Sequence, residues 1–159
     1  MELFVRDNVA GYRLATAAET LEYGRKISRL RKSKKLLVTA KQVVEHLQLS
    51  MGLLKVEEFR VIYVNNQNRL IGEVVLSEGT EDQTAVYPRK IMQKCLSLHA
   101  TGLVLVHNHP TGELRPSNAD LNITRKICQA AEVLDVRMLD HVIIGMDGYF
   151  SFRENSILE

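Results

Sequence analysis

Residues 103–120 read LVLVHNHPTGELRPSNAD, and this stretch decides the fold. Its first part, LVLVH, is a continuous apolar run of strand length, which predicts a buried central strand at 103–107. A polar loop containing proline and glycine follows at 108–116. A helix is then predicted to start at Ser117 and to run to about Leu134. The stretch therefore predicts a helix that folds back over the end of a buried strand.

The residues before this stretch predict a helix, a hairpin and a second helix. Thr39 followed by Gln42 is the pattern of a capping box, so we expect a helix that starts there and breaks at Gly52. The segments FRVIYV and LIGEVVL have strand composition, and the polar residues NNQN between them predict an antiparallel hairpin. Pro88 suits the first turn of another helix, which we expect Gly102 to end.

The residues after this stretch complete a mixed sheet. MLDHVIIG (138–145) and YFSFRE (149–154) predict two strands around a turn at 146–148. TAVY (84–87) predicts a short extra strand. Apart from that strand, the predicted order after residue 36 is α-β-β-α-β-α-β-β. We therefore predict a mixed α/β or α+β fold, with a mostly antiparallel sheet and helices on both sides.

Composition places the chain among ordinary globular proteins. It has 159 residues, of which 45% are hydrophobic and 25% are charged, enough for one domain with a core that needs no disulfides. The two cysteines form no CxxC pair, which predicts reduced thiols in a cytoplasmic protein. No stretch approaches the ~20 apolar residues of a membrane span, and the acids near the N-terminus speak against a secretory signal.

The net charge of +2 is unevenly distributed along the chain. Residues 24–35, GRKISRLRKSKK, hold seven of the 21 Lys and Arg and no acid, which leaves 14 basic residues against 19 acidic ones elsewhere. We therefore expect residues 1–36 to form a basic arm or helix ahead of a main domain at 37–159. The run at 25–35 suits weak contact with nucleic-acid phosphates, and the alternative is a solvated helix face.

Three residues around the predicted loop have the pattern of metal ligands. His107 and His109 lie two residues apart where the buried strand ends, a spacing that points both side chains to one face. Asp120 lies one turn into the helix that folds back over this strand end. Three protein ligands leave the fourth position of a tetrahedral zinc ion open, which is typical of catalytic zinc. Because zinc lowers the pKa of a bound water to about 7, the pattern predicts hydrolysis.

Hydrolysis also needs a carboxylate that moves a proton to the leaving group. The candidates are Glu57 and Glu58 at the start of the first predicted strand and Glu73 in the second, and spacing alone does not choose among them. Ser117 is suited to hydrogen-bond the attacking water or a developing oxyanion. Its position three residues before Asp120 is also that of an ordinary capping box, which is the alternative interpretation.

The remaining histidines are predicted to have structural roles. His46 is expected on the surface of its helix, and His99 near a helix C-terminus. His141 lies in a predicted strand directly after Asp140. We expect His141 to be a core residue, and the alternative is a group that supports the metal ligands.

The pattern His-x-His, seven residues, Ser, two residues, Asp resembles the JAMM (MPN+) metalloprotease motif. The closer resemblance is to the RadC family, a bacterial branch of that group, and it covers about residues 39–155. The segments that carry it are GTEDQTAVYPRKI (79–91), LVLVHNHPTGELRPSNAD (103–120) and LDHVIIG (139–145). The resemblance implies the sheet architecture that JAMM proteins share with cytidine deaminases.

The resemblance also implies roles for individual residues. His107, His109 and Asp120 would hold one zinc ion per chain, and Ser117 would orient the water or the tetrahedral intermediate. Alignment on the aromatic residue of the first strand and on the Asn-Arg-Leu turn places the general base at Glu57. The adjacent Glu58 is the fallback, and Glu73 has no catalytic counterpart in the family. Asn65 replaces an aspartate of the family pattern and is interpreted as a turn residue.

The activity implied by the JAMM resemblance is hydrolysis of an amide or isopeptide bond. The expected partner is a peptide or protein with an extended tail, and no membrane is expected. The RadC name points to DNA repair, but residues 1–35 lack the glycine pattern of the helix-hairpin-helix region that RadC proteins commonly carry. The alternatives are a DNA-associated protein, including a metal-dependent nuclease, and a binding module without catalysis.

Overall fold

The computed structural model describes residues 4–7, 11–30, 36–78 and 86–158. Its elements are β1 (Phe4–Asp7), β2 (Gly11–Leu14), α1 (Ala17–Leu30), α2 (Ala40–Met51), β3 (Glu58–Val64), β4 (Leu70–Glu78), α3 (Pro88–Ser97), β5 (Gly102–Asn108), α4 (Asn118–Val133), β6 (Arg137–Ile144) and β7 (Tyr149–Ser151). From α2 onward this order matches the order predicted from the sequence.

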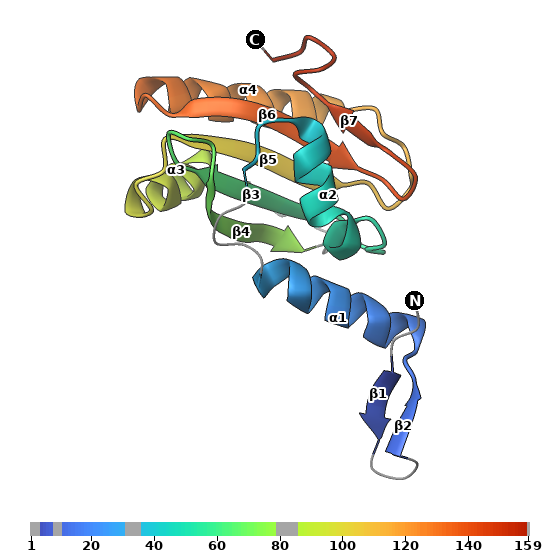
Figure 1. Cartoon of the computed structure of the whole chain (residues 1–159). Coiled ribbons are helices and arrows are strands. Elements are labelled where there is room, and N and C mark those ends of the chain that lie inside the picture. The colour runs from blue at the N-terminus through green and yellow to red at the C-terminus, as the bar shows by residue number, and fades with distance from the viewer. Residues whose placement is uncertain (1–3, 8–10, 31–35, 79–85, 159) are drawn as a thin grey trace.

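The main sheet has five strands in the order β4-β3-β5-β6-β7. Neighbouring strands are antiparallel except for β5 and β6, which are parallel and are connected through α4. Helices α3 and α4 cover one face of the sheet and α2 lies on the other (Figure 1). This arrangement confirms the predicted mixed fold with a mostly antiparallel sheet and flanking helices.

Strand β5 runs through the centre of the sheet and is buried over its whole length. Leu103 and Leu105 pack into the core that includes residues of α3 and α4, whereas Val104 and Val106 pack into the core that includes residues of α2. Because side chains alternate along a strand, His107 and Asn108, which end it, point to opposite faces. His107 points toward α4.

The predicted helix starts are confirmed, and one predicted helix end is wrong. The capping box of Thr39 with Gln42 is present, and Pro88 occupies the first turn of α3. Helix α3 ends at Ser97, and His99 beyond it has a φ of 52° in the left-handed region. This turn closes the helix early, so that Gly102 opens the next strand.

Two further expectations concern the loop before α3 and the turn after β3. Of the predicted short strand at 84–87, residues 86 and 87 lie outside any strand, and the other two lie outside the described residues. Asn65 is a turn residue as interpreted, because its Oδ1 accepts hydrogen bonds from the backbone N–H groups of Gln67 and Arg69, both at 3.0 Å.

The N-terminal region contains a hairpin that the sequence analysis missed. Strands β1 and β2 pair in antiparallel register, and α1 follows them and contacts α2. Figure 1 shows this hairpin extending away from the main sheet. Each strand has only four residues, too few for a clear alternating pattern. Residues 31–35 and the side chains of residues 25–30 lie outside the described part of the chain. Nucleic-acid contact by the basic run at 25–35 therefore stays a prediction.

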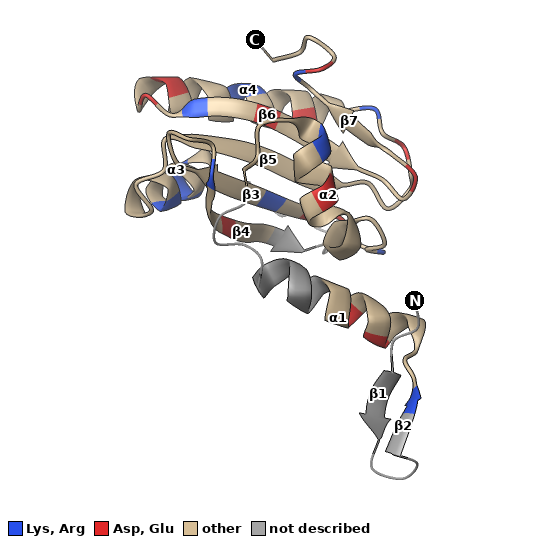
Figure 2. Cartoon of the chain, in the orientation of Figure 1, with Lys and Arg blue, Asp and Glu red and all other residues tan. Residues whose placement is uncertain are grey.

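The surface of the helices carries charges of both signs. Figure 2 shows acidic and basic residues together on α2 and α4. Within the described part of the chain, no helix has the length and apolar character that crossing a membrane requires. Cys95 is buried, Cys128 is half-buried, and both are free thiols.

Candidate metal centre

The three predicted ligands meet where the end of β5 faces the first turn of α4. His107 is the second-last residue of β5, and His109 directly follows the strand. Asp120 lies in the first turn of α4. The Nε2 atoms of the two histidines are 2.9 Å apart. The carboxylate of Asp120 lies 3.3 Å from His107 Nε2 and 3.6 Å from His109 Nε2. One ligand atom from each residue lies within 4.8 Å of the others.

The Nδ1 atom of His109 faces the backbone carbonyl of Glu113 at a distance of 2.5 Å. A carbonyl only accepts hydrogen bonds, so Nδ1 of His109 carries the proton. The neutral ring then has its lone pair on Nε2, which points toward His107 and Asp120. The loop after β5 therefore orients His109 with Nε2 directed into the cluster, as a metal ligand would require.

The tautomer of His107 is set by a chain of buried side chains. The hydroxyl of Thr124 donates to the backbone carbonyl of Asp120 at 2.5 Å and lies 2.6 Å from Nδ1 of His141. Because that hydroxyl proton is already donated, Nδ1 of His141 is the donor to Thr124. Nε2 of His141 then accepts from Nδ1 of His107 at 2.8 Å. This leaves the lone pair of His107 on Nε2, toward Asp120.

His141 is both a core residue and a partner of the metal-site histidine. Its side chain is fully buried, and burial lowers its pKa well below the ordinary value, with the neighbouring His107 acting in the same direction. The ring of Phe152 stacks on His141 with centroids 4.5 Å apart. The ring of Phe59 stacks on that of His107, with centroids 5.8 Å apart and an angle of 9° between the ring planes. Aromatic packing and hydrogen bonds thus restrict both imidazole rings.

Electrostatics favour an ionised carboxylate at the centre. Burial opposes the ionisation of Asp120, but its contacts with His107 and His109 and the hydrogen bond from Ser117 outweigh it and hold the pKa of the carboxyl well below its usual range. The hydrogen bond with Asp120 raises the pKa of His109 against the opposing effect of burial. A proton on His109 therefore competes with a cation for the same position.

The hydroxyl of Ser117 forms the cap of α4. Ser117 Oγ accepts from the Asp120 N–H at 3.2 Å and donates to the Asp120 carboxylate at 2.6 Å. The Ser117 N–H donates to the same carboxylate at 2.8 Å, which completes the capping box. The capping interpretation is confirmed, and the cap also orients a ligand carboxylate. The role of Ser117 toward water or an oxyanion stays a prediction.

The register of the sheet separates the two candidate bases at the start of β3. Phe59 lies opposite His107 in the β3–β5 ladder, and continuing this register by two residues places Glu57 opposite His109. Glu57 therefore shares the face of the metal ligands. Its side chain is exposed, and its charge adds to the raised pKa of His109, behind the hydrogen bond with Asp120. Glu58 points to the other face.

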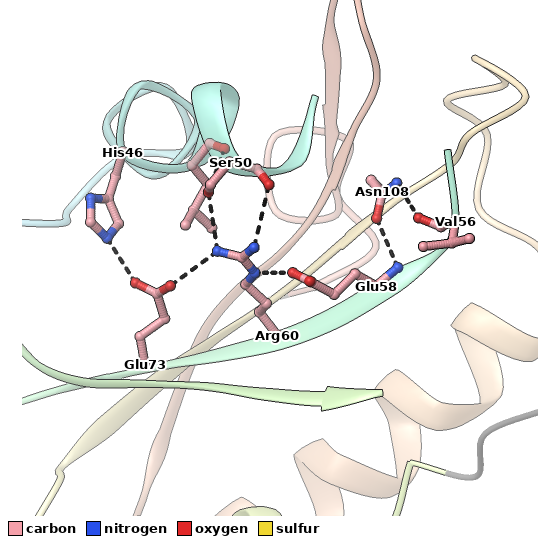
Figure 3. Close-up of polar contacts among 8 residues, drawn as sticks. His46, Ser50, Val56, Glu58, Arg60, Glu73 and Asn108 are labelled. Atoms are coloured by element: carbon pink, nitrogen blue, oxygen red, sulfur yellow. Dashed lines mark hydrogen bonds and ion pairs between the residues drawn. The ribbon is translucent and has the colours of Figure 1, made fainter. Parts of the chain in front are cut away.

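Glu58 and Glu73 are held in a buried polar cluster on the α2 side of the sheet (Figure 3). Arg60 forms an ion pair with Glu58, and its guanidinium lies 3.1 Å from the Glu73 carboxylate. His46 Nε2 lies 3.0 Å from the same carboxylate. The predicted surface position of His46 is wrong, because only 3% of this residue is exposed. Its helix turns this side chain inward, where Glu73 supplies a polar partner.

A cavity of about 460 Å³ opens beside the ligand loop. It is lined by residues 52–55, residues 108–112, Ile144 and Met146. Leu53 and Met146 are largely exposed there. His109 is one of its lining residues, so this cavity borders the cluster.

A mixed sheet between helices, with two histidines at a central strand end and an aspartate on the crossover helix, defines a JAB-type domain. Residues 37–157 match the family of RadC-like JAB domains, and the chain belongs to this family. The resemblance to RadC proteins is therefore confirmed.

Two relatives from Escherichia coli (strain K12) share this similarity. UPF0758 protein YeeS is 46% identical over 114 residues, which cover 72% of this chain and 77% of the relative. UPF0758 protein YkfG is 42% identical over 116 residues, which cover 73% of each chain.

Proposed function

We propose that this protein is a zinc-dependent hydrolase that cleaves an amide or isopeptide bond in a peptide or protein substrate. The observation that carries the proposal is the convergence of His107 Nε2, His109 Nε2 and the Asp120 carboxylate. Both imidazoles donate through Nδ1 to a neighbouring acceptor, so both Nε2 lone pairs face the carboxylate.

The donor set fits zinc. Two imidazole nitrogens and one carboxylate are a common set of protein ligands in catalytic zinc sites, where a fourth position stays open. When bound there, zinc would polarise the substrate carbonyl and make hydroxide available near neutral pH. A nuclease that uses two hard metal ions needs several carboxylates, and Asp120 is the one carboxylate in the described ligand group.

Glu57 is the residue we assign as general base and acid. Its place opposite His109, on the ligand face and in contact with solvent, supports this role. It would take the proton from the attacking water and pass it to the leaving amine. Ser117 would hold the Asp120 carboxylate in place through its hydroxyl, and it would have to turn that hydroxyl away from Asp120 to donate to the developing oxyanion.

The cavity beside His109 supports a substrate with an extended tail. Its apolar wall at Leu53 and Met146 suits side chains next to the cleaved bond, and Lys55 at its rim suits an acidic group. The substrate would then lie across the ends of β5 and β6, within reach of Glu57.

The test is hydrolysis of labelled peptides and isopeptide-linked lysine derivatives by protein loaded with one equivalent of zinc. We expect turnover that a chelator abolishes and that zinc restores. The matched variant is Glu57→Gln, which we expect to bind zinc and to lack turnover. Equal turnover by Glu57→Gln, or activity that survives complete removal of metal, would contradict the proposal.

A further inference from the structure

Asn108 lies between the two ligand histidines, but its side chain points to the opposite face of the sheet. It is buried, with 2% of its surface exposed. Figure 3 shows it beside the polar cluster on the α2 side. None of the proposed catalytic steps uses this amide, so its burial next to the ligands calls for another explanation.

Both ends of the Asn108 amide bind the chain on either side of Glu57. Asn108 Oδ1 accepts a hydrogen bond from the Glu58 N–H at 2.8 Å. Asn108 Nδ2 donates to the carbonyl of Val56 at 3.0 Å (Figure 3). The amide thus fixes the residue before and the residue after Glu57.

These bonds continue the sheet where its backbone ladder stops. The last register pair between β3 and β5 is Phe59 with His107. Beyond that pair, the N–H of His109 donates to Ile144 of β6, at 3.3 Å. The Asn108 side chain therefore joins the segment of Glu57 to the strand that carries the ligands.

The Glu58 side chain is anchored as well. Its carboxylate pairs with Arg60, whose guanidinium also donates to Ser50 Oγ at 3.0 Å and to Glu73 at 3.1 Å. Because successive side chains of an extended segment alternate, holding Glu58 on the α2 side keeps Glu57 on the ligand side. The cluster in Figure 3 thus fixes which face each glutamate occupies.

We propose that Asn108 is a positioning residue that sets the place of Glu57 relative to His107 and His109. This role rests on the proposed function, because the distance between Glu57 and the metal ligands matters only if Glu57 is the general base. An amide is required, since it offers a donor and an acceptor on one planar group. Aspartate keeps the acceptor for Glu58 but has no proton for the Val56 carbonyl when ionised.

The experiment compares cobalt-loaded with zinc-loaded protein by NMR. Co²⁺ shifts nearby amide signals by an amount that depends on their position relative to the metal, and zinc supplies the diamagnetic reference. For Asn108→Ala we expect cobalt binding within about threefold of the wild type, because all three ligands remain. We expect changed cobalt-induced shifts at Glu57 and Glu58, and at least tenfold faster hydrogen exchange of the Glu58 amide.

Asn108→Asp keeps the side-chain volume and serves if the alanine variant does not fold. We expect it to retain protection of the Glu58 amide and still to change the cobalt-induced shift at Glu57. The matched control is Asn65→Ala, which removes two side chain-to-backbone hydrogen bonds at the other end of β3. A merely structural loss should affect both sites alike, so we expect Asn65→Ala to leave the Glu57 shifts unchanged.

The outcomes separate the two proposals. If the wild type binds cobalt but both Asn108 variants keep the wild-type shifts at Glu57, the positioning role is wrong and the metal centre stands. If the wild type binds neither cobalt nor zinc, the proposed function fails and the positioning role fails with it. Changed shifts at Glu57 in the Asn65 control would also overturn the assignment to Asn108.

Discussion

Nε2 of His141 lies 2.8 Å from Nδ1 of His107, so a fully buried histidine determines which nitrogen of a candidate ligand histidine keeps its lone pair. Thr124 completes the chain by accepting from His141 and donating to the backbone of Asp120. Two of the three predicted ligands are therefore connected through side chains that need not touch the metal. Such indirect contacts commonly tune the affinity of a metal site.

The first prediction follows from this chain. Thr124→Val keeps the shape of the side chain and removes the hydroxyl, so His141 loses its acceptor and His107 its fixed tautomer. We expect zinc affinity to fall by about 10- to 100-fold, measured by competition with a chromophoric chelator. Thr124→Ser, which retains the hydroxyl, is the control and should bind zinc nearly as tightly as the wild type. Equal zinc affinities of the valine and serine variants would argue against a role of this hydrogen-bond chain in metal binding.

The second prediction concerns the ligands. His107→Ala and Asp120→Ala each remove one of the three protein donors, so we expect about one zinc per chain in the wild type and almost none in the variants. Metal content is measured by atomic emission on purified protein supplied with zinc. His99→Ala alters an exposed histidine at the end of α3 and should leave the zinc content unchanged. Stoichiometric zinc in the variant that combines His107→Ala with Asp120→Ala would show that other residues bind the zinc.

The third prediction separates the two neighbouring glutamates. Glu57→Gln should retain zinc and folding stability but lose turnover, because Glu57 is exposed on the ligand face. Glu58→Gln weakens the buried pair with Arg60, and we expect it to lower the free energy of unfolding by about 1.5–3 kcal/mol. Urea denaturation and peptide hydrolysis of both variants check this. The reverse pattern, with activity lost only at Glu58, would move the base to that residue.

The fourth prediction is a pH dependence of zinc binding. The hydrogen bond with Asp120 raises the pKa of His109, and a protonated His109 cannot bind metal. The affinity for zinc should therefore be highest above this raised pKa and should fall as the pH drops through it. This fall should begin at a higher pH than it would with a histidine of ordinary pKa. Chelator competition between pH 5 and 8 measures the curve. In Asp120→Asn any remaining affinity should decline only at lower pH.

The fifth prediction tests the basic run at 25–35. Removing residues 1–35 should leave zinc binding unchanged, since the candidate ligands and their hydrogen-bond partners lie in the segment from β5 to β6. If this run contacts phosphates, the truncated protein should lose affinity for DNA at low salt. Fluorescence anisotropy with a labelled duplex measures this. Equal DNA affinity of the two forms would remove the basic run as a nucleic-acid contact.

The convergence of the three candidate ligands was predictable because their geometry is local. The alternation of a strand places His107 and His109 together, and the capping pattern of Ser117 and Asp120 marks the start of the helix that approaches them. Thr124 was also within reach of the sequence, because it lies one turn after Asp120 on the same helix face. The residues at the end of β5 and at the start of α4 are thus enough to predict most of the candidate ligand group.

The contacts that were missed depend on pairings between distant segments. His141 meets His107 only because β6 lies beside β5 in parallel, and His46 meets Glu73 only because α2 covers β4 and β3 on the face away from the ligands. Spacing within one segment contains no signal for either pairing. Which of Glu57 and Glu58 shares the face of the candidate ligands likewise depends on the register of β3 against β5, which a resemblance to a family could suggest but the residue types could not.

The parallel pairing of β5 with β6 has a consequence for how this protein can change over time. Because α4 connects these two strands, the three candidate ligands and the side chains that hydrogen-bond to them all come from one continuous segment, 102–144. Glu57 comes from a separate part of the chain. Mutation can therefore replace the carboxylate that we propose as general base and leave the candidate ligand group complete, so under this proposal descendants of one gene could keep the metal while losing the reaction.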